Sequence, residues 1–479
     1  MTPPATPRSP FHRDELTVVL GASGVYALRM LGLYMALPIM STWSASLPGA
    51  TPFLVGLSVG AYGLTQAIFQ VPAGLLGDVR GRRVVILGSL LVFALGCLIV
   101  ALSHSIQMVI LGRLVQGVGA MASTLIALIG DVTREHVRTR AMALMGGVLG
   151  VAFAGGFLLG PLTSAHFGVP AVFGLAAALT AVGAVLFELL VPGRLVPRVG
   201  HAGPPRSVSA SGESQAGSGR PAPPWSWHEA KSLLHDRSLL VLDGGIAALH
   251  AALTGLFVVI PFVLKEFFGP LDLWKVYAPV LASGLASMVW ASHQADRPAR
   301  TRRVLRTGAV TLTIGLIGLA LFHRTLVGAA LSLWLFVVGF AMIEPVLASL
   351  LTRYTGRGAR GTAAGLFNMS QFGGAFVGGA LAGFLMQYGR MAPFAALSVL
   401  TGAWAISLSW LRNPEGIAIS SIEFPDLDES RWQALRQRLV SHPAILEADW
   451  TSGGPIRIRH WLALLTEADL AVLVRESPA

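Results

Sequence analysis

Twelve stretches of this sequence are built almost entirely of apolar residues, and most are about twenty residues long. A helix of about 20 apolar residues spans the hydrocarbon core of a bilayer, and a helix satisfies its own backbone polar groups there. We therefore predict an all-α polytopic membrane protein with twelve transmembrane helices. The stretches lie near residues 17–41, 54–76, 84–103, 107–130, 141–163, 170–191, 238–262, 276–291, 307–322, 327–351, 363–386 and 392–411, of which 276–291 is short and gives the weakest signal.

Composition excludes a soluble protein of ordinary kind. Of the 479 residues 53% are hydrophobic and only 12% are charged, with a mean hydropathy of +0.66. A typical soluble chain carries about 25% charged residues, because it must cover its surface. The single cysteine, Cys97, can form neither an internal disulfide nor a cysteine-rich metal site.

The basic residues are distributed as a topology signal. Net charge is +11, but the arginines cluster in short loops between apolar stretches, which argues against a nucleic-acid partner. The arginine-rich loops alternate along the chain with a second set of loops, which lie on the opposite side of the membrane. That second set holds only Lys265, Lys275, Arg324 and Arg390. The arginine-rich side is expected to face the cytoplasm. Both termini are then cytoplasmic in a bacterial inner (plasma) membrane, and the first stretch is an uncleaved span, too long for a signal peptide.

The chain divides into four parts. Residues 192–237 form a linker rich in Pro, Gly and Ser, whose end at Trp225–His235 fits a short amphipathic helix. On either side lie an N-terminal six-helix bundle (1–191) and a C-terminal six-helix bundle (238–411). Asp78 and Asp296 are 218 positions apart, and Thr133-Arg134 and Thr352-Arg353 are 219 apart, which indicates duplication. Paired six-helix repeats are a transporter architecture.

Residues 412–479 read as a small soluble domain. Strand patterns at 417–424, 445–450 and 456–461 alternate with a helix at 426–439 and a second helix capped by Thr466 and Asp469. The order β-α-β-β-α predicts an α+β ferredoxin-like domain that lacks an obvious last strand. His442 and His460 are expected to be structural, and no aromatic-basic RNA-binding pattern is present.

A motif follows the second span. Gly74, Leu76, Asp78, Gly81, Arg82 and Arg83 stand at the positions of the cytoplasmic loop motif of the major facilitator superfamily, which the sequence resembles. The family usually has Arg where this chain has Val79, and an arginine comes one place later, at Arg80. A tight turn at Gly81 brings Asp78 and Arg82 within pairing reach, and by family analogy Arg82 also reaches Asp131.

Two more motifs resemble the same superfamily. Arg113-Leu-Val-Gln116-Gly117-Val-Gly119-Ala120 lies in the fourth span and Gly156-x-x-x-Gly160-Pro161 in the fifth, the latter similar to an antiporter motif. Buried arginine in a span is costly and indicates a partner or a wet cavity, or else capping by carbonyls. Glycines four apart allow close helix packing, as at Gly156/Gly160, Gly374/Gly378 and Gly379/Gly383.

The set of motifs narrows the resemblance to the drug–proton antiporter branch, and within it to YajR-type transporters, which carry a ferredoxin-like domain after span twelve. The motifs are Leu28-Arg29-Met30-Leu31-Gly32, Tyr62-Gly-Leu-Thr-Gln66, Asp131-x-Thr133-Arg134-Glu135, Trp274-Lys275-Val276-Tyr277, Met342-x-Glu344-Pro345 and Ser370-Gln371-Phe372. The resemblance implies a proton-driven efflux fold and supplies no substrate.

Polar side chains inside apolar spans are the candidate site residues. For proton coupling we favour Glu344, in mid-span, over Asp243, Arg29 and Arg113; Asp243 lies nearer a span end and is expected to be wetter, and Glu188 is expected to be interfacial. The alternative is a Glu344 permanently paired with Arg29 or Arg113. The substrate-cavity candidates are Tyr34, Gln66, Gln70, Gln116, His250, Asn368 and Gln371, and the conformational-latch candidates are Gly74, Asp78, Gly81, Arg82, Arg83 and Asp131.

The expected function is proton-coupled efflux of small amphipathic organic molecules by alternating access, through a monomer in the bilayer. The alternatives are a uniporter or importer, or a membrane sensor with the tail as its regulatory module. No nucleophile arrangement or Walker A loop stands out, so we expect no enzyme activity, no catalytic residues, no metal site and no cofactor.

Overall fold

The structure is a computed structural model of the chain. It describes residues 11–191, 193, 231, 233–269, 272–295, 300–355, 360–412, 417–422, 429–442, 444–450, 455–461 and 465–475. The sequence landmark Asp296, most of the linker 192–237 and most of the Trp225–His235 segment lie outside these residues.

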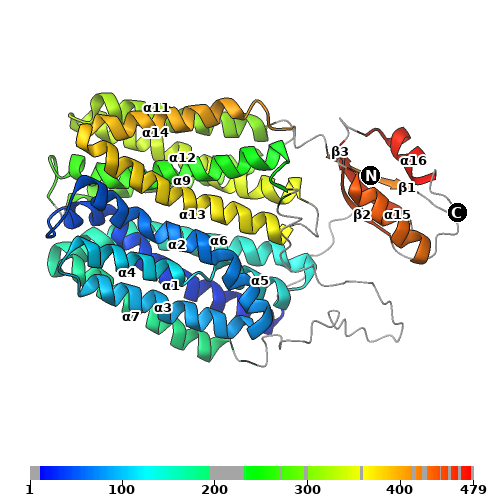
Figure 1. The fold of residues 1–479 in the computed structure, drawn as a ribbon, viewed down its shortest axis with the longest axis horizontal. Coiled ribbons are helices and arrows are strands. Elements are labelled where there is room, and N and C mark those ends of the chain that lie inside the picture. The colour runs from blue at the N-terminus through cyan, green and yellow to red at the C-terminus, as the bar shows by residue number, and fades with distance from the viewer. Residues whose placement is uncertain are drawn as a thin grey trace.

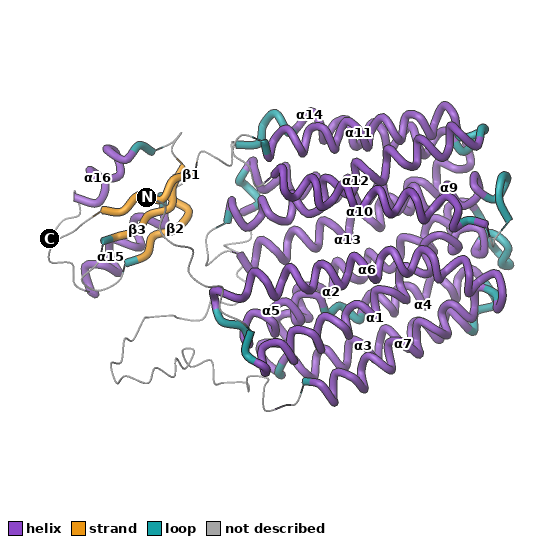
Figure 2. The backbone as a smooth tube through the Cα atoms, turned by 180° about the vertical axis from the view of Figure 1, so that it is seen from behind, coloured by secondary structure: helices purple, strands orange, loops and turns teal. Residues whose placement is uncertain are grey.

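Long helices lie side by side in a bundle, with the tail domain at one end (Figures 1 and 2). The first half contains α1 (Arg13–Ser44), α2 (Pro52–Arg80), α3 (Arg82–Ala101), α4 (Ile106–Val118), α5 (Ala122–Val132), α6 (Glu135–Phe167) and α7 (Val169–Leu190). The second half contains α9 (Arg237–Leu264), α10 (Trp274–Ala295), α11 (Thr301–Phe322), α12 (Leu326–Tyr354), α13 (Arg360–Leu385), a 3-10 turn (Met386–Tyr388) and α14 (Met391–Ser407).

These helices occupy the twelve predicted stretches, with α4 and α5 together forming the fourth span. Among the described residues, ten spans are long and apolar enough to cross a membrane. The other two predicted stretches are α10, whose stretch gave the weakest signal, and α14, which is apolar but 17 residues long. At 1.5 Å per residue α14 reaches about 26 Å, close to the core thickness of about 30 Å.

The fourth span is broken, which the sequence did not predict. Helix α4 ends at Val118 and α5 begins at Ala122. The break frees backbone carbonyls, and two side chains satisfy them: Arg29 Nη2 donates to Gly119 O at 2.9 Å, and Ser89 Oγ donates to Ala120 O at 2.9 Å. Broken helices are tolerated in membranes where neighbouring groups re-satisfy the backbone in this way.

The two halves pack closely at one end of the bundle. We call the end that holds Arg13, Arg80 and Tyr354 the tail end, since the tail domain lies there, and the opposite end the far end (Figure 1). Toward the far end α2 packs on α13: a Cβ added at Gly56 would lie 2.6 Å from Gly383 Cα, and one at Gly60 would lie 3.0 Å from Phe376 O. The predicted role of Gly379 and Gly383 in close helix approach is confirmed.

An aromatic cluster joins the halves on the other side of the bundle. Phe157 of α6 lies 4.9 Å from Phe257 of α9 and 5.9 Å from Tyr277 of α10, measured between ring centroids. All three are buried in one apolar core cluster. Helix α9 is the most enclosed of the ten described spans, since 83% of its most apolar segment is buried inside the bundle.

The tail has the predicted ferredoxin-like order. Its elements are β1 (Ile417–Ile422), α15 (Glu429–Ser441), β2 (Ile445–Asp449), β3 (Ile456–Trp461) and α16 (Glu467–Arg475). The strands form an antiparallel sheet in the order β1-β3-β2, with Ile419 opposite Arg459 and Ala448 opposite Ile458. Trp432, Leu435 and Leu439 of α15 pack on it. His460 is fully buried beside Ser420, at 2.9 Å, and His442 accepts from Ala444 N.

Candidate functional site

The loop between α2 and α3 forms a charged cluster at the tail end. Gly81 has φ of +94°, a conformation that glycine adopts without strain, so the predicted tight turn is present. Arg82 lies between two carboxylates, 3.1 Å from Asp78 Oδ1 and 2.5 Å from Asp131 Oδ2. Both predicted pairs are therefore formed.

The next residue, Arg83, ties the same loop to the end of α7. It pairs with Glu188 and donates to Val191 O at 3.0 Å. Glu188 is thus partly exposed at a helix end, as expected. The ion-pair partners of Arg82 and Arg83 lie on α2, α5 and α7, so in this conformation the cluster braces the first half.

A further ion pair at the tail end was missed by the sequence analysis. Glu15 of α1 is buried and accepts two hydrogen bonds of 2.9 Å from the Arg134 guanidinium and one of 3.0 Å from Arg134 N. This pairing raises the pKa of Arg134. Arg134 belongs to a quoted motif, whereas Glu15 carries no signal beyond a carboxylate at a span start.

Arg29 is the centre of a buried polar network inside the first half. Besides Gly119 O, its Nη2 lies 3.4 Å from both Tyr62 Oη and Gln66 Oε1, and its guanidinium lies over Phe93. Gln66 in turn donates to Gln70 Oε1 at 3.1 Å. Arg29, Gln66 and Gln70 are all 0% exposed.

Arg113 is held by carbonyls, the alternative that the sequence left open. It donates to Ser58 O and Val59 O at 3.2 Å and to Gln116 Oε1 at 2.7 Å. Gln116 donates onward to Cys97 Sγ at 3.2 Å. Arg29 and Arg113 thus have partners within the first half, and neither is paired with Glu344.

The predicted cavity residues consequently fall into two groups. Gln66, Gln70 and Gln116 are buried in the network of the first half and do not face an open space in this conformation. The others lie where the halves meet. His250 of α9 stands at the centre: its Nε2 lies 2.8 Å from Gln371 Nε2 of α13 and 3.8 Å from Glu344 Oε1 of α12.

Aromatic rings flank this second group. Measured between ring centroids, Phe340 lies 5.7 Å from His250. On the first half, Tyr34 lies 4.8 Å from Phe153 by the same measure. Tyr34 packs against the apolar core cluster that includes Phe340 of the second half. The Glu344 side chain is 42% exposed although it lies well inside a span. An ionisable side chain inside a span usually faces the bundle interior or a water-filled cavity, which agrees with a polar site between the halves.

Asp243 and Glu344 are both half-buried in this conformation, so the expectation that Asp243 is the wetter of the two stays a prediction. Asp243 Oδ1 is buried without a hydrogen-bond partner among the described residues. The reason is the position of α9 within the bundle, where Trp404 packs beside it and donates to Val241 O at 3.0 Å.

Of the remaining predicted residues, one lies near the site and the others pack helices together. Asn368 is half-buried on α13, three residues before Gln371. Gly156 and Gly160 pack on α1, where a Cβ at Gly156 would lie 2.6 Å from Tyr34 Cβ and one at Gly160 would lie 2.8 Å from Met35 C. Pro161 follows inside α6. These glycines therefore set the position of Tyr34.

The family model of the Major Facilitator Superfamily matches residues 22–271 and 245–468. The chain belongs to the major facilitator superfamily. It is 34% identical over 442 residues to the inner membrane transport protein YajR of Escherichia coli, covering 90% of this chain and 91% of that one.

Other major facilitator proteins are more distant. The multidrug resistance protein MdtH of Aeromonas hydrophila is 26% identical over 76% of this chain and 86% of its own. A bacterial homologue of the human lysosomal transporter Spinster, solved in an inward-facing and unoccupied conformation, superposes with a TM-score of 0.60 at 14% identity, covering 84% of this chain and 95% of that one. That likeness concerns the fold alone.

Membership settles the broad class of this protein. It is a multi-pass membrane transporter of the major facilitator superfamily and not an enzyme. Small molecules are the cargo of this superfamily. The junction group of Glu344, His250, Gln371 and Tyr34 accordingly lies where such a cargo is expected, between the two six-helix halves.

Proposed function

We propose that this transporter exports small amphipathic organic molecules in exchange for protons, by alternating access in a bacterial inner membrane with both termini in the cytoplasm. The observation that carries the proposal is the half-exposed carboxyl of Glu344 at the junction, next to His250 and Gln371. A carboxyl there can accept a proton from one side and release it to the other as the halves move.

The surroundings of Glu344 support an amphipathic cargo. Tyr34, Phe153 and Phe340 offer apolar ring faces, whereas Gln371, His250 and Glu344 offer polar atoms. Binding pockets for small molecules commonly combine aromatic walls with a few polar groups. YajR and MdtH are named as transport and multidrug resistance proteins, which is consistent with an organic cargo.

The packing at the far end supports alternating access. Contacts of Gly56 and Gly60 with α13, and of Phe157 with Phe257, close that end. With the arginine-rich side in the cytoplasm, this conformation is inward-facing. The conformation open at the far end requires these contacts to separate.

The test uses purified full-length protein in proteoliposomes with an imposed pH gradient, a compound panel and a lumenal pH dye. Wild type is expected to show compound-dependent proton flux. Glu344→Gln keeps the shape and removes titration, so gradient-driven transport should fall at least tenfold while compound exchange persists. The matched control is Glu266→Gln, which removes a carboxyl that pairs with Arg390 at a helix end.

Other outcomes decide between the alternatives. Compound flux that ignores the pH gradient indicates a uniporter, and no flux for any compound favours a sensor. Full gradient-driven transport by Glu344→Gln would instead favour Asp243 as the coupling group, whose Oδ1 is buried without a hydrogen-bond partner among the described residues.

A further inference from the structure

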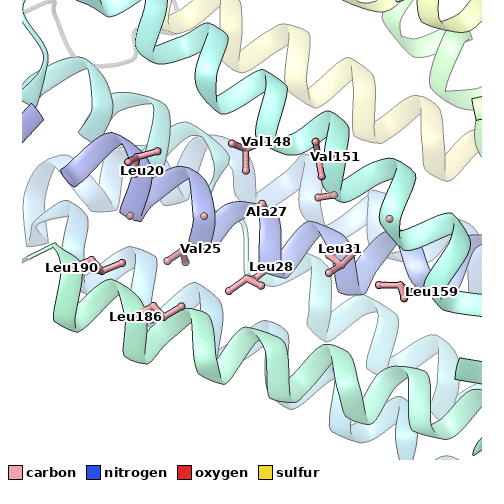
Figure 3. A pocket seen from close by; sticks show the side chains of 14 residues that line it. Leu20, Val25, Ala27, Leu28, Leu31, Val148, Val151, Leu159, Leu186 and Leu190 are labelled. Atoms are coloured by element: carbon pink, nitrogen blue, oxygen red, sulfur yellow. The ribbon is translucent and has the colours of Figure 1, made fainter. Parts of the chain in front are cut away.

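A groove of about 460 Å³ lies on the first half between α1, α6 and α7 (Figure 3). Every residue that lines it is apolar. Leu20, Gly24 and Leu28 come from α1, Val151 and Gly155 from α6, and Leu190 from α7. None of the site residues discussed above lines it.

The groove opens toward the bilayer. Phe157 marks the face of α6 that touches the second half. Val148, which lines the groove, lies about 180° around the helix from Phe157 at about 100° per residue. Val151 is 72% exposed and Leu159 42% exposed. Since α6 spans the membrane, these side chains face acyl chains.

Small residues create the groove, and helix packing does not require them. A Cβ added at Gly24 would meet nothing within 4 Å, and one at Gly155 would meet only Leu31 Cδ1, at 3.4 Å. At the neighbouring Gly156 a Cβ would lie 2.6 Å from Tyr34 Cβ. Gly156 is needed for helix contact, whereas Gly24 and Gly155 leave space.

The groove has the length of one leaflet. From Leu20 to Leu31 along α1 it extends about 16 Å at 1.5 Å per residue, about half of the bilayer core of about 30 Å. Its tail end lies toward the start of α1 and α6 and the end of α7.

Arginines stand beyond that end on the same helix faces. Arg13 precedes Leu20 by seven residues, about 10 Å along α1, which places it in the headgroup layer. Arg140 precedes Val151 of the groove by eleven residues on α6, which places the two about 20° apart around the helix at about 100° per residue. Both arginines are exposed. Basic groups at the mouth of a crevice between spans recognise anionic headgroups.

We propose that this groove binds one acyl chain of an anionic phospholipid of the surrounding membrane, with its phosphate held by Arg13 and Arg140. Lipid chains are as apolar as the groove, so burial of the chain alone favours no particular lipid. Selection must come from the headgroup. The proposal is independent of the transport mechanism.

The test is native mass spectrometry of the full chain in detergent with equimolar phosphatidylglycerol and phosphatidylcholine of identical chains. Wild type should retain one phosphatidylglycerol with at least fivefold preference, the order expected for one or two arginines near the headgroup. Gly24→Leu/Gly155→Leu fills the groove and should lose that lipid. The control Gly88→Leu adds the same side chain at an exposed site on α3 with nothing within 4 Å.

A second pair of variants tests the headgroup. Arg13→Gln/Arg140→Gln should retain a lipid but lose the preference for phosphatidylglycerol, whereas Arg324→Gln, beyond α11 at the far end, should keep it. The proposal is overturned if wild type retains both lipids equally. It is also overturned if Gly24→Leu/Gly155→Leu retains as much phosphatidylglycerol as wild type. If the groove variant fails to insert, the arginine variant is a sufficient test. The proposal is then overturned if Arg13→Gln/Arg140→Gln keeps the wild-type preference for phosphatidylglycerol.

Discussion

At the scale of single residues, Arg82 is shared between Asp78 and Asp131. Exposed ion pairs add little to stability, but a pair whose partners change between two states biases their populations. We expect this loop to latch the conformation closed at the tail end, since closing that end brings the second half against it. Asp78→Asn should then shift the protein further toward the conformation closed at the far end and slow exchange about five- to thirtyfold, as 1–2 kcal/mol would. Single-cysteine labelling at both ends, in a Cys97→Ser background, measures this.

The matched control for Asp78→Asn is Glu188→Gln, which removes the partner of the adjacent Arg83 and loses the same charge. If Asp78→Asn leaves cysteine labelling unchanged at both ends, the proposal that this loop acts as a latch is contradicted.

A second residue-scale prediction concerns the cap of α16. Thr466 N and Oγ1 both donate to Asp469 Oδ2, and these hydrogen bonds lower the pKa of Asp469. The ionised Asp469 carboxylate therefore stabilises α16 above the unfolded pKa of about 3.9. This stabilisation of α16 is lost as pH falls through the pKa of Asp469 in the folded protein. Asp469→Asn should speed amide exchange in α16 at pH 7, and the difference from wild type should shrink as pH falls below about 3.9 toward the folded value. Thr466→Ala should reproduce the effect at pH 7; equal exchange in wild type and variant would contradict it.

At the scale of elements, closure of the far end depends on glycine contacts between α2 and α13. A Cβ at Gly56 would lie 2.6 Å from Gly383 Cα, where backbone cannot give way. We predict that Gly56→Leu separates these helices and raises cysteine labelling at the far end at least fivefold. Gly88→Leu, which meets open space, is the control. Unchanged far-end labelling would show that other contacts close that end.

The spans were predictable because apolar length alone decides them, and the tail because alternation and capping residues are local signals. The break at Gly119–Met121 was not predictable, since it depends on Arg29 and Ser89 reaching its carbonyls from other helices. Likewise a glutamine in a span gives no sign of which way it faces. Gln66 and Gln371 look alike in sequence, yet one is buried beside Arg29 and the other faces the junction.

At the scale of the whole molecule, the tail domain touches the bundle at the end of α12. Arg459 Nη2 of β3 donates to Arg353 O at 2.7 Å and to Thr355 O at 3.1 Å. A cation at a helix C-terminus is favoured by the unpaired carbonyls and by the helix dipole. Helix α12 also carries Glu344, so the tail is positioned to influence the helix that bears the proposed coupling group.

We predict that the tail modulates transport without forming the pathway. Truncation after Arg412 should leave an inserted protein with residual transport, because the described tail core of Trp432, Leu439 and Ile458 is separate from the bundle core. Arg459→Ala should change the transport rate in the same direction as truncation, by up to about tenfold for loss of a charge-assisted hydrogen bond of about 1.5 kcal/mol. Arg457→Ala, an exposed arginine on the same strand face, should not. A truncated protein that inserts normally but transports nothing would place the tail within the transport machinery.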